Sequence, residues 1–484
     1  MGVLSHLEPK DVFYYFEEIT KIPHGSGNEK AISDWLVKFA NEHNLEVIQD
    51  KANNIIIKKS GTQGYENAPT VILQGHMDMV CEKNKDTSHD FEKDPLKLRI
   101  EGDYIYATGT TLGADNGIAM AYALAILASK DIPHPPLEVL LTVEEETGMG
   151  GAMAIDGSLL NGKIMINMDS EEEGKLLVSC AGGVRTRHLL NIEWMDAPSN
   201  LVPYVIAIRG LKGGHSGMEI DKGRGNSNKI MGRILNDLSN SFDFEIAEIN
   251  GGSKMNAIPR ECDAVVLINE EDKTNFEAKI KEWDEILKNE LRASDAGVSV
   301  LFSKLENKIQ KVFSKETKEK AIAALVLIPN GIKTMSMHIK DLVESSTNLG
   351  VVATEGDTIR FESALRSSVR SLKYAILNEA EMVAKVLGLQ LIADSDYPEW
   401  QYNPDSKIRD VMIEIYKDMF GSEPEIYAIH AGVECGLLGE KLGGADMISF
   451  GPNLFDVHTP DEHMSISSVQ RMWNYLLKVL AAVK

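Results

Sequence analysis

The chain has 484 residues, more than one hydrophobic core usually serves, so we expect two or more domains. Its composition, 43% hydrophobic and 25% charged residues, is ordinary for a soluble globular protein. A formal net charge of −23 argues against nucleic acid and against an anionic membrane surface as partners. The longest strongly apolar stretch, IAMAYALAILA, is shorter than the roughly 20 residues of a membrane-spanning helix.

The cysteines are scattered and form no CxxC pair, which suits a reducing compartment and argues against a disulfide framework. The N-terminal sequence MGVLSHLEPKDVFYYFEEI has no basic start followed by an apolar core, so it does not resemble a secretory signal. The sequence therefore predicts a cytoplasmic protein. The cysteines are Cys81, Cys180, Cys262 and Cys435.

The first third of the chain alternates helical and strand patterns. Residues 29–44 have helical spacing, and residues 116–130 form a helix that is apolar nearly all round and should be buried. Short apolar runs between and after them predict strands. This alternation indicates an α/β sheet with helices on both faces. The expected strands are residues 45–50, 54–60, 70–76, 137–143 and 163–169.

The pattern changes after CAGGVRT, where longer strands alternate with amphipathic helices. This region, residues 185–395, reads as a large α+β insert, and its second part repeats a similar order of elements. We expect two related halves. The α/β pattern then returns with a strand within residues 445–452 and helices at 407–420 and 468–483. The sequence thus predicts one α/β domain, residues 1–184 and 396–484, interrupted by the insert.

The stretch VILQGHMDMV, residues 71–80, begins as a buried strand and runs into a histidine and a carboxylate. His76 and Asp78 are two residues apart, so in a strand they face the same side. Sites in open α/β sheets gather outside the carboxyl ends of strands. Taken alone, the pair would be read as a hydrogen-bonded core histidine beside a solvated aspartate.

Other potential ligands follow core elements in the same way. Asp115 lies between glycine-flanked residues at the mouth of the buried helix, where the alternative is an N-cap. Three glutamates, residues 144–146, directly follow an apolar strand, where the alternative is a solvated loop. Asp169 ends another apolar strand, and His458 and His463 follow the C-terminal strand by a short loop. Their joint occurrence favours a site over five separate coincidences.

Two histidines with several carboxylates and no sulfur suit zinc, manganese or cobalt in a hydrolytic site. Charge counting favours two ions. Asp115, Glu146 and Asp169 contribute −3, and two divalent ions contribute +4, which leaves +1 for a bridging hydroxide to neutralise. Metal ions about 3.5–4 Å apart can share a carboxylate, lower the pKa of water and polarise a carbonyl group.

Together these segments resemble the di-zinc exopeptidases of the aminoacylase/carboxypeptidase superfamily, and more closely its aminoacyl-histidine (Xaa-His) dipeptidase group. The resemblance covers essentially the whole chain, and the insert is similar to that family's lid domain. It implies a catalytic domain with a mixed central sheet flanked by helices, interrupted by an α+β lid. The motifs that carry the resemblance are GHMDMV, GADNGIAMA, EEETGMGGA, NMDSEE, HAGVECGLL and HTPDEHMS.

The resemblance implies roles around a first metal ion for four of these residues. His76 resembles a ligand of this ion, and Asp78 the carboxylate that orients the histidine. Asp169 resembles the second carboxylate ligand of the same ion. Asp115 resembles the bridging ligand, and the peptide bond after it is often cis in the family.

The resemblance also implies a general base and the ligands of a second ion. Glu145 matches the base that activates water, and Glu146 matches a ligand of the second ion beside His458. Adjacent side chains of an extended chain point opposite ways, so we expect one glutamate at the metal and the other at the water. Glu144 and His463 receive no role.

In the insert, the resemblance implies residues that bind the substrate. His215 has the spacing of a lid histidine that stabilises the oxyanion, and Asn256 and Arg366 resemble residues that bind the backbone and the C-terminal carboxylate. A loop histidine, a turn asparagine and a surface arginine are the alternatives. His430 and Glu434 belong to a loop that the family places near the active site, where the carboxylate would suit a free α-amine.

The implied activity is that of a metallo-dipeptidase, with a hydroxide between two divalent ions, zinc before cobalt or manganese, attacking the carbonyl of an unblocked dipeptide. Smaller relatives dimerise through the lid, so a homodimer and His215 acting in cis or in trans both stay open. Alternatives are another exopeptidase or amidase of the superfamily, such as an aminotripeptidase, a carboxypeptidase or an N-acyl amino acid deacylase. A non-catalytic peptide-binding protein should have lost a ligand or the base, and this sequence has lost neither.

Overall fold

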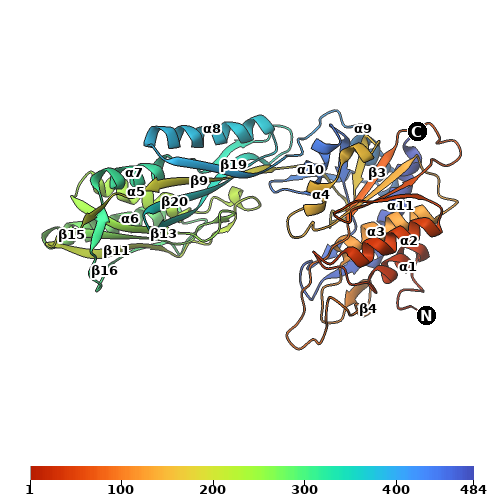
Figure 1. Cartoon of the computed structure of the whole chain (residues 1–484), viewed down its shortest axis with the longest axis horizontal. Helices are drawn as coiled ribbons and strands as arrows, with labels where there is room; N and C mark the ends of the chain where they lie inside the picture. The colour runs from red at the N-terminus through yellow and green to blue at the C-terminus, as the bar shows by residue number, and fades with distance from the viewer. Residues whose placement is uncertain (1) are drawn as a thin grey trace. The chain divides into compact units, whose positions relative to one another are not determined.

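The computed structural model describes residues 2–484, and the chain forms two compact units. The first, here called the terminal unit, uses the chain up to Ser179 together with residues 402–428 and 433–484. The second, here called the insert unit, comprises Cys180–Gln401 and Ile429–Gly432. Figure 1 shows the red and orange first segments and the blue last segments of the chain together in the terminal unit.

The terminal unit is built on an eight-stranded sheet of order β1-β2-β6-β3-β7-β23-β8-β22. Its four middle strands, β6, β3, β7 and β23, pair in parallel, so their carboxyl ends lie along one edge. All four coincide with strands that the sequence predicts, and so do β1 and β2. The strands are β1 (Glu46–Gln49), β2 (Ile55–Lys59), β3 (Val71–His76), β6 (Leu137–Thr142), β7 (Ile164–Asn167), β8 (Lys175–Cys180), β22 (Glu425–Ile429) and β23 (Asp446–Ser449).

Seven α-helices accompany this sheet within the described part of the unit. The helix α3 has every residue from Asn116 to Leu127 buried, which confirms its predicted place in the core. A four-stranded sheet of order β24-β25-β5-β4 completes the unit. The helices are α1 (Lys10–Ile19), α2 (Lys30–Glu42), α3 (Ala114–Ala128), α4 (Gly150–Ala154), α9 (Lys407–Phe420), α10 (Glu434–Lys441) and α11 (Ile466–Ala482), with the short helix η1 (Gly157–Leu159). The small strands are β4 (Leu98–Glu101), β5 (Tyr104–Ala107), β24 (Leu454–Phe455) and β25 (His463–Ser465).

The insert unit contains an antiparallel sheet of order β16-β11-β15-β13-β19-β20-β9-β21, with β18 paired to β19. The strands are β9 (Gly182–Asn191), β11 (Leu201–Arg209), β13 (Phe244–Gly251), β15 (Cys262–Asn269), β16 (Ser299–Lys304), β18 (Gly331–Met335), β19 (Val343–Glu355), β20 (Thr358–Ser367) and β21 (Gln390–Tyr397). The shorter pairs are β10 (Trp194–Asp196) with β17 (Lys311–Phe313) and β12 (Gly214–His215) with β14 (Ala257–Ile258).

Amphipathic helices cover this antiparallel sheet. Their apolar faces, including Leu235 of α5, Phe276 of α6 and Leu325 of α7, share one buried cluster with strand residues such as Ile206 and Val266. The helices are α5 (Ser227–Ser239), α6 (Lys273–Glu290), α7 (Lys315–Leu327) and α8 (Arg370–Leu387), with the short helices η2 (Ile220–Lys222) and η3 (Glu270–Asp272). The predicted fold class, a mixed α/β sheet interrupted by an α+β insert, is confirmed. The relation between the two halves of the insert stays a prediction.

Between residues 2 and 484, no helix combines the length and the apolar character that a bilayer-crossing helix needs.

Candidate metal centre

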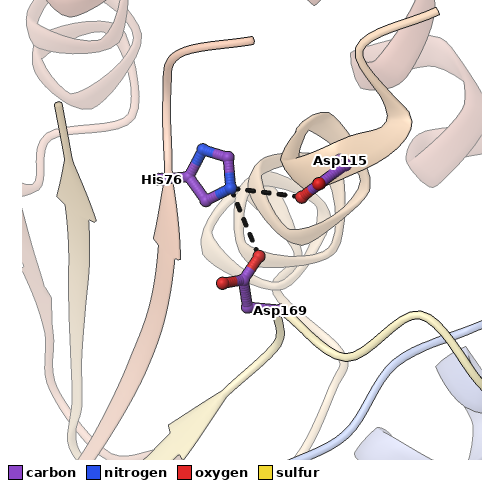
Figure 2. Close-up of side chains that lie close together, drawn as sticks. All are labelled: His76, Asp115 and Asp169. Atoms are coloured by element: carbon purple, nitrogen blue, oxygen red, sulfur yellow. Dashed lines mark hydrogen bonds and ion pairs between the residues drawn. The ribbon is translucent and has the colours of Figure 1, made fainter. Parts of the chain in front are cut away.

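Histidine and carboxylate side chains converge at the carboxyl edge of the parallel strands. His76 is the last residue of β3, Asp169 follows β7, and Asp115 lies at the start of α3. The Nε2 atom of His76 lies 3.2 Å from Oδ1 of Asp115 and 3.2 Å from Oδ1 of Asp169 (Figure 2). The donor atoms of these three residues lie within 4.8 Å of one another, which is close enough to surround one metal ion.

A second triad uses the other oxygen of the same aspartate. The Nε2 atom of His458 lies 3.2 Å from Oδ2 of Asp115 and 2.9 Å from Oε1 of Glu146. These donor atoms also lie within 4.8 Å of one another. Asp115 therefore presents one carboxylate oxygen to each histidine, which is the arrangement expected of a ligand shared by two ions.

The hydrogen bonds of His76 show that this triad fits a cation. Its Nδ1 donates to the carbonyl oxygen of Asp78 at 3.0 Å, so the neutral ring carries its proton there. The lone pair on Nε2 is then directed at two carboxylate oxygens, which repel it unless a proton or a metal ion lies between them. The ring is only 1% exposed, so water cannot relieve this repulsion. A nitrogen and oxygen donor set without sulfur suits Zn²⁺, Co²⁺ or Mn²⁺.

Asp78 contacts His76 through its backbone carbonyl oxygen, and its carboxylate holds the loop that follows β6. Its Oδ1 accepts a hydrogen bond from the backbone N–H of Glu145 at 3.0 Å. Its Oδ2 accepts from the N–H of Glu146 at 3.2 Å and from Oγ of Ser26 at 2.8 Å. Burial alone would raise the pKa of Asp78, but His76 and these donors hold it below its ordinary value.

The structure differs from the prediction of an extended chain at the three glutamates. The carbonyl oxygen of Glu145 accepts hydrogen bonds from the N–H groups of Gly148 and Met149, each at 3.1 Å, so the chain turns here. The turn, rather than strand alternation, sets the directions of Glu145 and Glu146. Burial raises the pKa of Glu145 to about 8, and neighbouring negative charges add to this effect while His76 opposes it.

The alternative interpretation of Asp115 as an N-cap is wrong. The N-cap of α3 is Gly113, and Asp115 itself has a non-helical backbone and a cis peptide bond to Asn116. The Oδ1 atom of Asn116 accepts from the N–H of His76 at 3.2 Å. A Cβ on Gly75 would lie 2.4 Å from this oxygen, so only glycine lets β3 and α3 approach so closely here.

Two further carboxylates near the triads were not predicted as site residues. Glu171 lies two residues after Asp169, and burial raises its pKa to about 7, with the negative charges of Asp115 and Asp169 adding to the shift. Glu462 lies four residues after His458 and accepts hydrogen bonds from the backbone N–H groups that precede Asp115. Both residues occur in motifs that carry the resemblance, but their spacing alone gives no signal for these contacts.

Three predicted substrate-binding residues lie together in the insert unit. Gly217 lies in close contact with all three. A Cβ atom added to this glycine would be 2.4 Å from the carbonyl oxygen of His430, 3.1 Å from Cε1 of His215 and 3.3 Å from Nε of Arg366. The buried Nε of Arg366 has no hydrogen-bond partner in the part of the chain that the structure describes. The same arginine and Asn256 line a pocket of about 310 Å³.

The tautomer of His215 follows from its backbone contacts. The N–H groups of Gly217 and Met218 donate to its Nδ1 at 3.3 and 3.1 Å. The neutral ring must therefore carry its proton on Nε2, which leaves an N–H free to donate. Burial and the positive charge of Arg366 lower the pKa of His215, which favours this neutral form.

Glu434 and His463 contact other side chains of the terminal unit. Glu434 is 1% exposed, and its Oε2 accepts from Nε2 of Gln74 at 2.7 Å and from Oγ1 of Thr142 at 2.8 Å. This interior position does not support the predicted contact of Glu434 with a substrate amine. The ring of His463 stacks on Tyr106 with centroids 4.7 Å apart and belongs to neither triad.

The metal-free protein is expected to lose stability as the pH rises from about 6 to about 9. Hydrogen bonds to Asp115 and Glu146 raise the pKa of His458 to about 10. Burial raises the pKa of Glu145 to about 8 and that of Asp169 to about 7. Because folding raises these pKa values, the folded protein keeps protons that the unfolded chain releases. The stability that these protons provide is complete below the pKa of each group in the unfolded chain, and it is lost as the pH rises through the pKa of that group in the folded protein.

Divalent ions replace the retained protons, so the rise in Tm on adding Zn²⁺ should grow with pH. Thermal unfolding of chelator-treated protein, with and without Zn²⁺ across this range, checks the prediction. A Tm of the metal-free protein that stays constant or rises with pH would contradict it.

An α/β sheet with two triads of nitrogen and oxygen donors that share an aspartate is the arrangement expected of a metal-dependent hydrolase. The chain belongs to peptidase family M20/M25/M40, whose family model matches residues 72–482. This finding confirms the resemblance seen in the sequence motifs.

Full-length relatives agree with this membership. The cytosol non-specific dipeptidase of Escherichia coli (strain K12) is 38% identical over 483 residues, which span 100% of this chain and 99% of the relative. The crystal structure of the aminoacylhistidine dipeptidase from Vibrio alginolyticus has a TM-score of 0.96 and 39% identity, covering 99% of this chain and 98% of that chain. The aminopeptidase PepT from Bacillus cereus shares the fold, with a TM-score of 0.57, 15% identity and 99% of each chain covered.

Proposed function

We propose that this protein is a cytoplasmic metal-dependent dipeptidase that hydrolyses unblocked dipeptides, Xaa-His dipeptides among them. The observation that carries the proposal is the carboxylate of Asp115, whose two oxygens face two separate histidines at 3.2 Å each. The relatives with 38% and 39% identity over nearly their whole lengths bear the names of a cytosol non-specific dipeptidase and an aminoacylhistidine dipeptidase.

The proposed centre holds two divalent ions, with zinc the best match to its donors. His76 and Asp169 would hold one ion, His458 and Glu146 the other, and Asp115 both. When bound, such ions lower the pKa of water and polarise a carbonyl group. The total charge of −3 on the three carboxylates favours two cations over one.

Glu145 is the proposed general base. The N–H donated to Asp78 at 3.0 Å fixes its backbone beside the triads. Its pKa of about 8 in the metal-free protein keeps it mostly protonated at neutral pH, and nearby cations shift it toward the ionised form. The ionised carboxylate accepts a proton from the attacking water and returns it to the leaving nitrogen.

The insert unit supplies the proposed contacts to the substrate. Arg366, whose Nε has no partner among the described residues, suits the C-terminal carboxylate of a dipeptide, because a guanidinium can bind a carboxylate through two parallel hydrogen bonds. His215 donates from Nε2 to the oxygen that becomes negative when the carbonyl carbon is attacked. Asn256, in the same pocket as Arg366, suits the substrate backbone.

A substrate panel tests the proposed function. Metal-loaded protein is assayed with Xaa-His dipeptides, other unblocked dipeptides, tripeptides, N-acetylated dipeptides and N-acyl amino acids, and Glu145→Gln controls for a contaminating peptidase. We expect kcat/KM for unblocked dipeptides to exceed the values for all other classes by about 100-fold or more. A substrate that lacks a charged end, or places it elsewhere, leaves a polar group of the site without its partner. Preference for tripeptides or for N-acyl amino acids would instead identify an aminotripeptidase or a deacylase.

A further inference from the structure

The buried carboxylate of Glu462 binds the backbone of the segment that ends at Asp115. Glu462 is 2% exposed, and both of its oxygens accept hydrogen bonds from successive backbone N–H groups. Its Oε2 accepts from Leu112 at 2.6 Å and Gly113 at 3.0 Å. Its Oε1 accepts from Ala114 at 2.8 Å and from Asp115 itself at 3.4 Å.

These N–H groups have no acceptor within their own helix. Residues 112–115 span the N-cap Gly113 and the first residues of α3, where backbone N–H groups find no carbonyl oxygen of the helix to donate to. The N-cap Gly113 has no side chain that could accept them. Glu462 supplies the missing acceptors from about 350 residues along the chain, and a carboxylate makes stronger hydrogen bonds to N–H groups than a neutral oxygen does.

The position of Glu462 links two ligands that are distant in sequence. It lies on the loop between β24 and β25, and the same loop carries His458. The strand β25 pairs with β5, which anchors the far end of this loop. Glu462 thus ties the His458 loop to the backbone of Asp115, whose Oδ2 lies 3.2 Å from Nε2 of His458.

We propose that Glu462 is a positioning residue of the metal centre, which fixes Asp115 so that each of its oxygens faces one histidine. The inference rests on the proposed metal centre and adds a residue that binds no ion itself. Carboxylates that orient ligands typically contribute 10- to 100-fold to metal affinity. A carboxylate that only capped α3 would contribute to stability and leave metal affinity unchanged.

Glu138 offers a matched control for the capping explanation. It is also 2% exposed and accepts from the backbone N–H groups of Asn161 at 2.8 Å and Gly162 at 2.9 Å. It lies near the amino end of β6, whereas Glu145 and Glu146 follow the carboxyl end of that strand. Glu138→Gln therefore removes a comparable buried acceptor far from the triads.

The test measures metal binding by the full-length protein and by Glu462→Gln and Glu138→Gln. Chelator-treated samples are titrated with Zn²⁺ against a chromophoric chelator, and the visible absorption of bound Co²⁺ reports ligand geometry. Glu462→Gln turns an NH₂ group toward N–H donors, so we expect an affinity loss of about 10- to 100-fold and an altered Co²⁺ spectrum. Glu138→Gln should lower Tm while its Zn²⁺ affinity and Co²⁺ spectrum stay those of the unsubstituted protein.

Three outcomes separate the possibilities. Wild-type affinity and an unchanged Co²⁺ spectrum in Glu462→Gln would overturn the inference and leave the metal centre intact. Absence of Zn²⁺ binding by the unsubstituted protein would refute the metal centre itself, and the inference with it. Should Glu462→Gln fail to fold, Glu462→Asp keeps the charge with a shorter reach and is expected to show a smaller loss of affinity in the same direction.

Discussion

Glu145→Gln is expected to lower kcat for dipeptide hydrolysis by about 10²- to 10⁴-fold, the usual contribution of a general base. Glutamine keeps the size of the side chain and the backbone N–H donated to Asp78, but it cannot accept the proton of water. Because no proposed ligand is removed, the metal content should stay that of the unsubstituted protein. Steady-state kinetics and elemental analysis of the same sample measure both quantities.

Glu144→Gln is the matched control for this experiment. Glu144 is the neighbouring residue, its side chain is exposed, and it belongs to no candidate triad of the described chain. Its substitution should leave kcat and metal content unchanged. Full turnover by Glu145→Gln would show that another group accepts the proton.

Asp115→Asn is expected to have the second large effect, on metal binding itself. The substitution leaves one oxygen where two are needed to face His76 and His458, and it removes one negative charge from the centre. We expect Zn²⁺ affinity to fall by more than about 100-fold, since loss of a ligand should exceed the 10- to 100-fold effect of losing a residue that only orients one. Hydrolysis should be lost in parallel.

Asp295→Asn controls for the loss of a buried aspartate as such. Asp295 lies in the insert unit, is 0% exposed and accepts from the N–H groups of Lys212 at 2.8 Å and Gly225 at 2.9 Å. Asp295→Asn should have a lower Tm and an unchanged Zn²⁺ affinity. If Asp115→Asn bound Zn²⁺ as tightly as the Asp295 variant does, a shared ligand at position 115 would be untenable.

The residues predicted as ligands could be found because most of them follow apolar runs that predict core strands. The β-branched and aliphatic runs of β3 and β7 predict core strands, and each run is followed by a ligand-type side chain where parallel strands end. The structure brings His76, Asp115 and Asp169 together at this edge. Their role as metal ligands stays a prediction, as do the roles of the insert residues.

Contacts that depend on backbone N–H groups could not be predicted in the same way. Glu462 binds residues 112–115, and Asp78 binds the turn at Glu145, so these hydrogen bonds join distant segments. The pattern of apolar and polar residues gives no signal for them. The interior place of Glu434 could not be predicted either, because it depends on hydrogen bonds from Gln74 and Thr142, which are distant in sequence. Its contact with a substrate amine stays a prediction.

The central claim is that two divalent ions share Asp115, and a crystal of the full-length protein soaked with Zn²⁺ tests it most directly. Anomalous difference maps at the zinc absorption edge locate the ions independently of the protein atoms. We predict two peaks, one bonded to His76 and Asp169, the other bonded to His458 and Glu146, with Asp115 bonded to both. No peak, or a single peak that leaves one histidine without metal, would contradict the account.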